Sequence, residues 1–209
     1  MLNEIILIGG GGHSKACIDV IESTQQYKIV GIIDSYKQPG TDVLGYTIIG
    51  GDQHIQSQPC QLFVISVGQI KSVAARIKLY EKVLQANKSC PKIISPHAYV
   101  SQHASIGDGT IVMHGVCVNA AARIGINCIV NTKANIEHDA IVGNHCHIST
   151  GATINGDCKV GNNCFIGSSS VVSSQVSITD NVIIGAGSVV VKNIDMPGTY
   201  VGNPVRRIA

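Results

Sequence analysis

The sequence has 209 residues, which is enough for one large or two small domains. Its 15 lysine and arginine residues nearly balance 13 acidic residues, and no basic run is long enough to bind nucleic acid, so DNA and RNA are not expected partners. The apolar stretches are short and the start, Met1–Glu4, lacks the basic segment of a signal peptide, so we expect a cytoplasmic protein without membrane insertion.

The first part of the chain alternates predicted strands with predicted helices. Apolar runs over residues 2–8, 29–33 and 62–67 predict three strands, and a helical pattern covers residues 71–84. A second helical pattern follows the first strand through residues 16–21. Such alternation indicates a small, Rossmann-like parallel α/β sheet, which we assign to a domain over residues 1–95.

Four consecutive glycines, Gly9–Gly12, join the first predicted strand to the first predicted helix. Backbone N–H groups at a helix start can hold a phosphate, and Asp34 ends the next strand about twenty residues further on. A dinucleotide site is one interpretation, but Ser14 replaces the third glycine of that motif and the domain has too few elements. The nucleotide of a sugar substrate fits this sheet better, and a turn without a ligand is the third alternative.

Pro96 marks the expected start of a second domain over residues 96–209. From Val100 to Val190 every sixth residue is isoleucine or valine without exception, a period that fits neither a simple strand nor a helix. The position four residues after each of these is mostly small. Hexapeptide repeats of this kind predict an all-β parallel β-helix, with the β-branched residues in its core.

The repeat resembles the left-handed parallel β-helix of the hexapeptide acyltransferases. In that family three hexads make one triangular turn, which implies about five turns here and stacks residues eighteen positions apart. No break interrupts the hexads, so we expect no external loop over the site and expect a neighbouring subunit to close it.

The eight cysteines are interpreted as structural. Cys128, Cys146, Cys158 and Cys164 fall on the small position of the hexad, where a thiol acts as a compact apolar filler. The sequence has no CxxC pair, so we expect neither disulfides nor a metal site.

One polar cluster in the repeat, Asn131–Asp139, is a candidate for chemistry. His138, between Glu137 and Asp139 at its end, has Ala120 and Gly156 eighteen positions away on either side, which leaves room for an imidazole. A carboxylate bonded to one ring nitrogen would fix the tautomer and raise the basicity of the other nitrogen. The cluster therefore predicts a general base.

The whole chain resembles the family of sialic acid O-acetyltransferases and nucleotide-aminosugar N-acetyltransferases. The matching segments, spread over essentially the whole sequence, are Ile8–Ser14, Ile32–Asp34, Gly45–Gly50, Ser66–Gly68, Ser95–Pro96, Ile136–Asp139, Val191–Asp195 and Gly202–Pro204. This resemblance implies an acetyl-CoA-dependent N-acetyltransferase that acts on a UDP-, dTDP- or GDP-linked 4-amino-deoxysugar in surface polysaccharide or glycan biosynthesis. It also implies a homotrimer with active sites between neighbouring coils.

The resemblance also implies roles for individual residues. His138 matches the catalytic base, and Asp139 matches the acidic residue that strengthens it. The positions that match contacts to acetyl-CoA are His147, Ser168 and Ala186. Those that match the nucleotide-sugar site of the first domain are Gly11, Gly12, His13, Asp34 and Gly68.

Two alternative functions stay open from the sequence. An O-acetyltransferase of sialic acid or a related nonulosonic acid would have the same fold, and the sugar-binding loops do not separate it from the N-acetyltransferase. The other alternative is a β-helical assembly module without catalytic activity, against which the Glu137–Asp139 cluster and the nucleotide-type first domain both argue.

Overall fold

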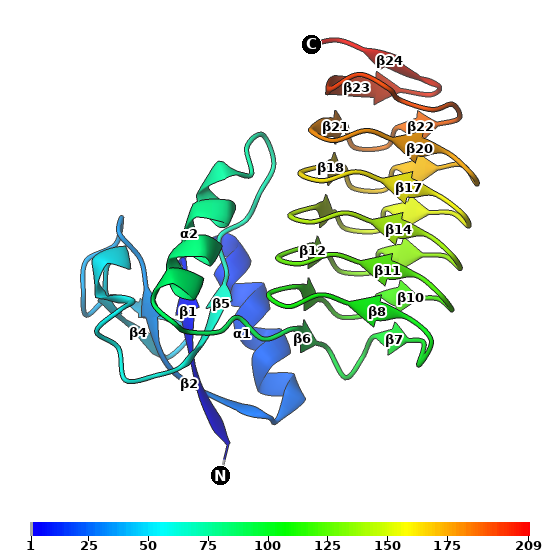
Figure 1. Ribbon diagram of the computed structural model, residues 1–209. Helices are drawn as coiled ribbons and strands as arrows, with labels where there is room; N and C mark the ends of the chain where they lie inside the picture. Colours follow the sequence, from blue (N-terminus) through cyan, green and yellow to red (C-terminus); the bar gives the residue numbers. More distant parts are fainter. Residues whose placement is uncertain (1) are drawn as a thin grey trace.

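The computed structural model describes residues 2–209 and consists of an α/β part followed by a parallel β-helix (Figure 1), which confirms the expected fold class. The elements of the α/β part are β1 (Asn3–Ile8), α1 (Gly12–Thr24), β2 (Tyr27–Ile33), β3 (Asp42–Val43), β4 (Tyr46–Gly50), the 3₁₀ helix η1 (Asp52–His54), β5 (Leu62–Ile65) and α2 (Ala74–Gln85). Among these residues no helix has the length and apolarity needed to span a membrane.

The sheet of the α/β part has the order β3-β4-β2-β1-β5. Strand β1 is parallel to both β2 and β5, so it is central and its residues Ile5–Ile8 are buried on both faces. Ile5 and Leu7 share a core with α1, whereas Ile6 and Ile8 share one with α2. Because the carboxyl ends of parallel strands meet at one edge, the glycine loop, Asp34 and Gly68 all lie at the same edge of this sheet.

The β-helix is built from three sheets of very short strands. The first contains β7 (Tyr99–Val100), β10 (Cys117–Val118), β13 (Asn135–Ile136), β16 (Thr153–Ile154), β19 (Val171–Val172) and β22 (Val189–Val190). The second contains β8 (Ser105–Ile106), β11 (Arg123–Ile124), β14 (Ile141–Val142), β17 (Lys159–Val160) and β20 (Ser177–Ile178). The third contains β6 (Ile93–Ile94), β9 (Ile111–Val112), β12 (Ile129–Val130), β15 (His147–Ile148), β18 (Phe165–Ile166), β21 (Val182–Ile184), β23 (Gly198–Gly202) and β24 (Val205–Arg207).

Residues eighteen positions apart stack in register, as the hexad pattern predicts. Val118, for example, pairs with Val100 on one side and Ile136 on the other, and Val118 and Ile136 are fully buried. Cys128, Cys146 and the other small-position cysteines are buried free thiols, which agrees with their interpretation as core filler. The described residues contain no cluster of histidine, cysteine and acidic side chains that could hold a metal ion.

The first strand of the coil comes earlier than the expected domain boundary at residues 95/96. Strand β6 pairs in parallel with β9, so Ile93 and Ile94 already belong to the third sheet. Figure 1 shows the α/β part beside the first turns of the coil, and α1 and the coil share one apolar core. The two parts are therefore packed against each other rather than joined only by a linker.

A buried arginine of α2 links the α/β part to the coil. Arg76 is 1% exposed and its guanidinium donates to the carbonyl oxygens of Ile65 and Val67 and to Asn127 of the coil. Burial lowers the pKa of Arg76 to about 10, so the side chain still carries its charge at neutral pH. The charge is balanced by oxygen dipoles rather than by a carboxylate.

Candidate active site

His138 and Asp139 form a hydrogen-bonded pair on the surface of the coil. They lie at the corner between the first and second sheets, directly after β13. His138 Nδ1 is 2.9 Å from Asp139 Oδ2, and because a carboxylate only accepts, Nδ1 carries the proton and Nε2 has a free lone pair. The hydrogen bond to Asp139 raises the pKa of His138. The pair thus has the arrangement of a general base and its orienting carboxylate.

The local backbone explains why these two residues meet. Asp139 has a φ of 60°, in the left-handed region that aspartate and asparagine tolerate better than most residues, and its N–H donates to Ala120 O of the preceding turn. On the following turn, a Cβ at Gly156 would lie 2.6 Å from His138 Cε1 and 2.7 Å from Nε2. The absence of a side chain at Gly156 therefore makes room for the imidazole.

Glu137, the other flanking carboxylate, makes no hydrogen bond to the imidazole of His138. Its Oε1 accepts from Asn135 Nδ2 and its Oε2 from Asn119 Nδ2, each at 2.9 Å. The hydrogen bond from Asn135 is the main reason that the pKa of Glu137 is lowered. Asp139, rather than Glu137, is therefore the carboxylate that orients His138.

A second group of candidate residues surrounds a cavity of ≈ 460 Å³ where the α/β part meets the coil. The residues that line this junction cavity are His13, Gly68, Gln69, Ile70, Asn131, His147, Ser149, Phe165 and Ser168. Four of the predicted nucleotide-sugar or acetyl-CoA positions, His13, Gly68, His147 and Ser168, are thus brought together from segments far apart in the sequence.

Both histidines of the junction cavity are held neutral. His147 Nδ1 donates to Gln69 O at 2.6 Å, so Nε2 is the acceptor and receives the amide of Asn131 at 3.2 Å. Burial, with a smaller contribution from the charge of nearby Arg76, lowers the pKa of His147 and of His13 to about 4. His13 Nε2 is buried and has no hydrogen-bond partner among the described residues, so its hydrogen-bonding capacity is unused in the folded chain.

The acetyl-CoA positions Ser168 and Ala186 lie on successive turns of the coil, and Ser168 itself lines the junction cavity. Ser168 Oγ is 2.9 Å from Ser149 Oγ, and Ser168 O accepts from Gly187 N, next to Ala186 on the following turn. Ser168 and Ala186 therefore follow each other along the coil axis. His138 lies at a different corner, between other sheets, and does not line the junction cavity of its own chain.

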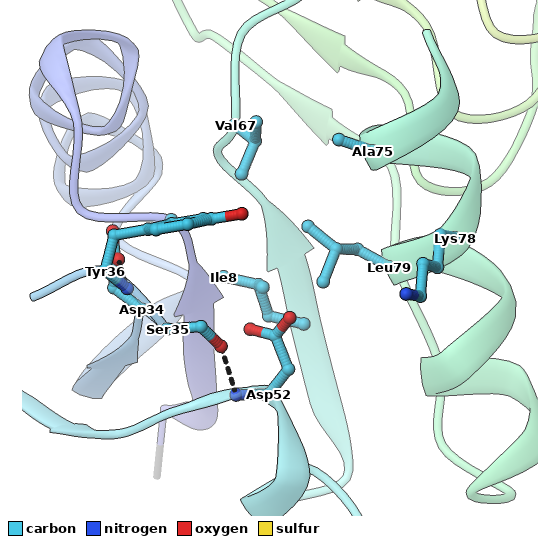
Figure 2. Close-up of a pocket in the computed structure, with 10 residues that line it drawn as sticks. Ile8, Asp34, Ser35, Tyr36, Asp52, Val67, Ala75, Lys78 and Leu79 are labelled. Carbon is cyan, nitrogen blue, oxygen red and sulfur yellow. Dashed lines mark hydrogen bonds between the residues drawn. The ribbon is translucent and has the colours of Figure 1, made fainter.

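Asp34 uses its carboxylate to organise the backbone around the glycine loop. Its Oδ2 accepts from Gly10 N at 2.7 Å, and its Oδ1 accepts from Tyr36 N at 2.7 Å and Lys37 N at 3.2 Å. Gly11 and Gly12 have open space where a side chain would lie, so a ligand can approach their backbone. Asp34 also lines a smaller pocket of ≈ 170 Å³ at this edge of the sheet (Figure 2).

Several residues of these sites were not predicted from the sequence. Gln69, Phe165 and Asn131 contribute to the junction cavity, and Tyr36 and Asp52 contribute to the pocket beside Asp34. Asn131 lies within the Asn131–Asp139 cluster that the sequence singled out, but its place beside the junction cavity was not predicted. The others follow no motif, because their positions depend on how distant segments pack.

Two family descriptions match the chain. The PglD N-terminal domain matches residues 4–83, and the bacterial transferase hexapeptide (six repeats) matches residues 157–192. Comparison with curated proteins gave no significant match. The fold and the two matches together define a sugar acyltransferase of the hexapeptide type.

Solved structures agree with this class over the full chain. The acetyltransferase domain of PglB from Neisseria gonorrhoeae has 27% identity, covers 99% of this chain and 100% of its own, and has a TM-score of 0.91; it has also been solved in complex with acetyl coenzyme A. PerB from Caulobacter crescentus, in complex with CoA and GDP-perosamine, has 29% identity, coverage of 100% and 99%, and a TM-score of 0.91. WeeI from Acinetobacter baumannii, at 22% identity over 100% of both chains and a TM-score of 0.87, shares the fold. The chain thus combines a PglD-type N-terminal domain with hexapeptide repeats and is similar over its whole length to sugar acetyltransferases built in the same way.

Proposed function

We propose that the protein transfers an acetyl group from acetyl-CoA to the amine of a nucleotide-linked 4-amino-deoxysugar, for surface polysaccharide or glycan biosynthesis. The observation that carries this proposal is the exposed His138–Asp139 pair on a β-helix that matches PerB and PglB over its whole length. The structure of PerB contains CoA and GDP-perosamine. The structure of the PglB acetyltransferase domain has been solved in complex with acetyl coenzyme A.

The chemistry needs one proton acceptor and no covalent enzyme intermediate. The neutral amine attacks the thioester carbonyl, the C–N bond forms, the C–S bond breaks, and CoA leaves as the thiolate. His138 Nε2 accepts the proton of the amine, and Asp139 stabilises the resulting imidazolium through Nδ1–H. Holding the amine and thioester in contact supplies much of the rate, since an amine is already a good nucleophile.

The two substrates are assigned to different parts of the molecule. The nucleotide lies at the sheet edge formed by Gly11, Gly12 and Asp34, and the sugar extends towards Gly68 and His13 in the junction cavity. Acetyl-CoA lies along the coil, beside the line formed by His147, Ser168 and Ala186. The buried, unpartnered Nε2 of His13 supports a polar ligand at this place.

We further propose a homotrimer. His138 does not line the junction cavity of its own chain, so a neighbouring coil has to bring the base of one subunit to the cavity of another. Tyr99 and Ile141 on the faces of the coil are 61% and 36% exposed, which favours packing of these faces against another copy.

The test is an acetyl-transfer assay that follows CoA thiol release with GDP-, UDP- and dTDP-linked 4-amino sugars beside free sialic acids. We expect turnover only with an amino-sugar nucleotide, and His138→Ala should lower kcat by about 10²-fold or more without unfolding the protein. His103→Ala, which changes an exposed histidine outside both sites, is the matched control. Turnover with free sialic acid alone would instead identify an O-acetyltransferase, and wild-type turnover by His138→Ala would exclude His138 as the base.

A further inference from the structure

The pocket beside Asp34, here called the α2 pocket, has room for one flat nucleobase. It has a volume of ≈ 170 Å³ and lies between the ends of β1, β2 and β5 and the helix α2 (Figure 2). Ile8, Val67, Ala75 and Leu79 form its apolar walls. Its polar lining residues are Asp34, Ser35, Tyr36, Asp52 and Lys78.

Tyr36 provides an unused aromatic surface at this pocket. The side chain is 100% exposed, and Figure 2 shows its ring at one side of the pocket, with Leu79 of α2 on the other side. A tyrosine ring that contacts nothing in the folded chain gains apolar burial and stacking energy when a flat ligand lies against it. The pocket therefore favours a nucleobase over a phosphate or a sugar.

Asp52 is the carboxylate in the α2 pocket whose oxygens are free. Its backbone N–H donates to Ser35 Oγ at 3.0 Å, but its side chain makes no hydrogen bond or ion pair within residues 2–209 and does not cap η1. Figure 2 shows the carboxylate pointing into the space between Tyr36 and Leu79. Asp34, in contrast, already accepts backbone N–H groups with both oxygens.

We propose that Asp52 selects guanine as the base of the nucleotide sugar; this inference rests on the proposed function. A carboxylate only accepts hydrogen bonds, and guanine presents two adjacent donors, N1–H and the N2 amino group, which pair with both oxygens. Uracil and thymine present one N–H between two carbonyl oxygens. A carboxylate facing them therefore gains one hydrogen bond and is repelled by the carbonyl oxygens on either side of that N–H. Lys78, across the pocket, is a donor suited to guanine O6.

Calorimetry on the full-length protein with GDP, UDP and dTDP tests this assignment, because the three ligands share the diphosphate and differ at the base. We expect GDP to bind at least about tenfold more tightly than UDP, since one additional charge-assisted hydrogen bond distinguishes them. Tyr36→Ala should weaken all three nucleotides by a similar factor, about 10-fold or more, because stacking is tolerant of base identity.

Asp52→Asn is the decisive variant. An asparagine amide presents an acceptor beside an N–H donor, which pair equally with guanine O6 and N1–H and with uracil O4 and N3–H. The variant should therefore lose at least about tenfold in GDP affinity, because the two charge-assisted bonds to guanine are gone, while UDP affinity holds or rises. Asp42→Asn is the matched control, since Asp42 is an exposed aspartate of the same part of the chain, outside the pocket. It should leave the GDP-to-UDP ratio unchanged.

Three outcomes separate this inference from the proposed function. Wild-type protein that prefers UDP or dTDP would overturn the guanine assignment, while acetylation of a UDP- or dTDP-linked amino sugar would leave the proposed function standing. An unchanged GDP-to-UDP ratio in Asp52→Asn would overturn the role of Asp52 even if GDP is preferred. Protein that binds none of the three and acetylates no nucleotide-linked sugar would overturn both.

Discussion

Replacing Gly156 by alanine should lower the catalytic rate without lowering stability, and it leaves the imidazole of His138 in the protein. The added Cβ would lie 2.6 Å from His138 Cε1, whereas carbon atoms in contact rest at about 3.5–4.0 Å, so the ring has to move by about 1 Å. His138 is a largely exposed side chain and can move, but a shift of this size misplaces Nε2 or breaks the 2.9 Å bond to Asp139. A misplacement of about 1 Å can cost about 10²-fold in rate, so we expect kcat to fall by that order.

The free energy of unfolding of Gly156→Ala, in contrast to kcat, should rise slightly or stay unchanged. Gly156 does not have a positive φ, so alanine is compatible with the backbone there, and the loss of glycine freedom in the unfolded chain adds about 0.4–1 kcal/mol to the free energy of unfolding. Steady-state kinetics and urea denaturation on the same sample measure both effects. Ser174→Ala, at the equivalent place one turn further along the coil, is the control. Wild-type kcat in Gly156→Ala would show that the position of His138 does not matter for turnover.

Three further predictions concern the base, the junction between the two parts, and assembly. Asp139 raises the pKa of His138, so Asp139→Asn should move the acidic limb of the pH profile of kcat/KM to lower pH. The variant should also reduce the maximal rate less than His138→Ala does. A pH profile and a rate that both match wild type would show that Asp139 does not tune His138. Arg76→Leu should lower the free energy of unfolding by at least about 3 kcal/mol, because the oxygens of Ile65, Val67 and Asn127 lose their buried donor. Urea denaturation measures this change, and a decrease of less than about 1 kcal/mol would contradict the prediction. Light scattering at micromolar concentration should give the mass of a trimer, and a monomer mass would exclude a site shared between subunits.

The hexad pattern predicted the coil well because the same residue types face the core on every turn. Val118 and Ile136 are eighteen positions apart in the sequence and directly paired in the sheet, and this relation repeats along the chain. Periodic burial of this kind can be read from the spacing of apolar residues alone. The three strands predicted in the first part were likewise found, since each is a short apolar run that the helices cover.

The short β3–β4 hairpin and η1 were not predicted, although η1 contributes Asp52 to the α2 pocket. Their residues are mixed in polarity, and β3 has only two residues, so neither period stands out. Asp34 was predicted as a ligand-binding acid from its place after a strand, yet both of its oxygens bind the protein backbone. The free carboxylate of the pocket is Asp52, which no motif marks.

The sequence by itself determined the architecture of this protein and its candidate base. A strict six-residue period leaves one way to bury its apolar residues, and the His138–Asp139 pair joins adjacent residues that a single corner brings together. Only the tertiary structure decided the environment of the other candidates. His147 owes its tautomer to Gln69, 78 positions away, and Arg76 owes its burial to Asn127, 51 positions away. Such contacts form when two separately patterned parts pack together, and no spacing within either part encodes them.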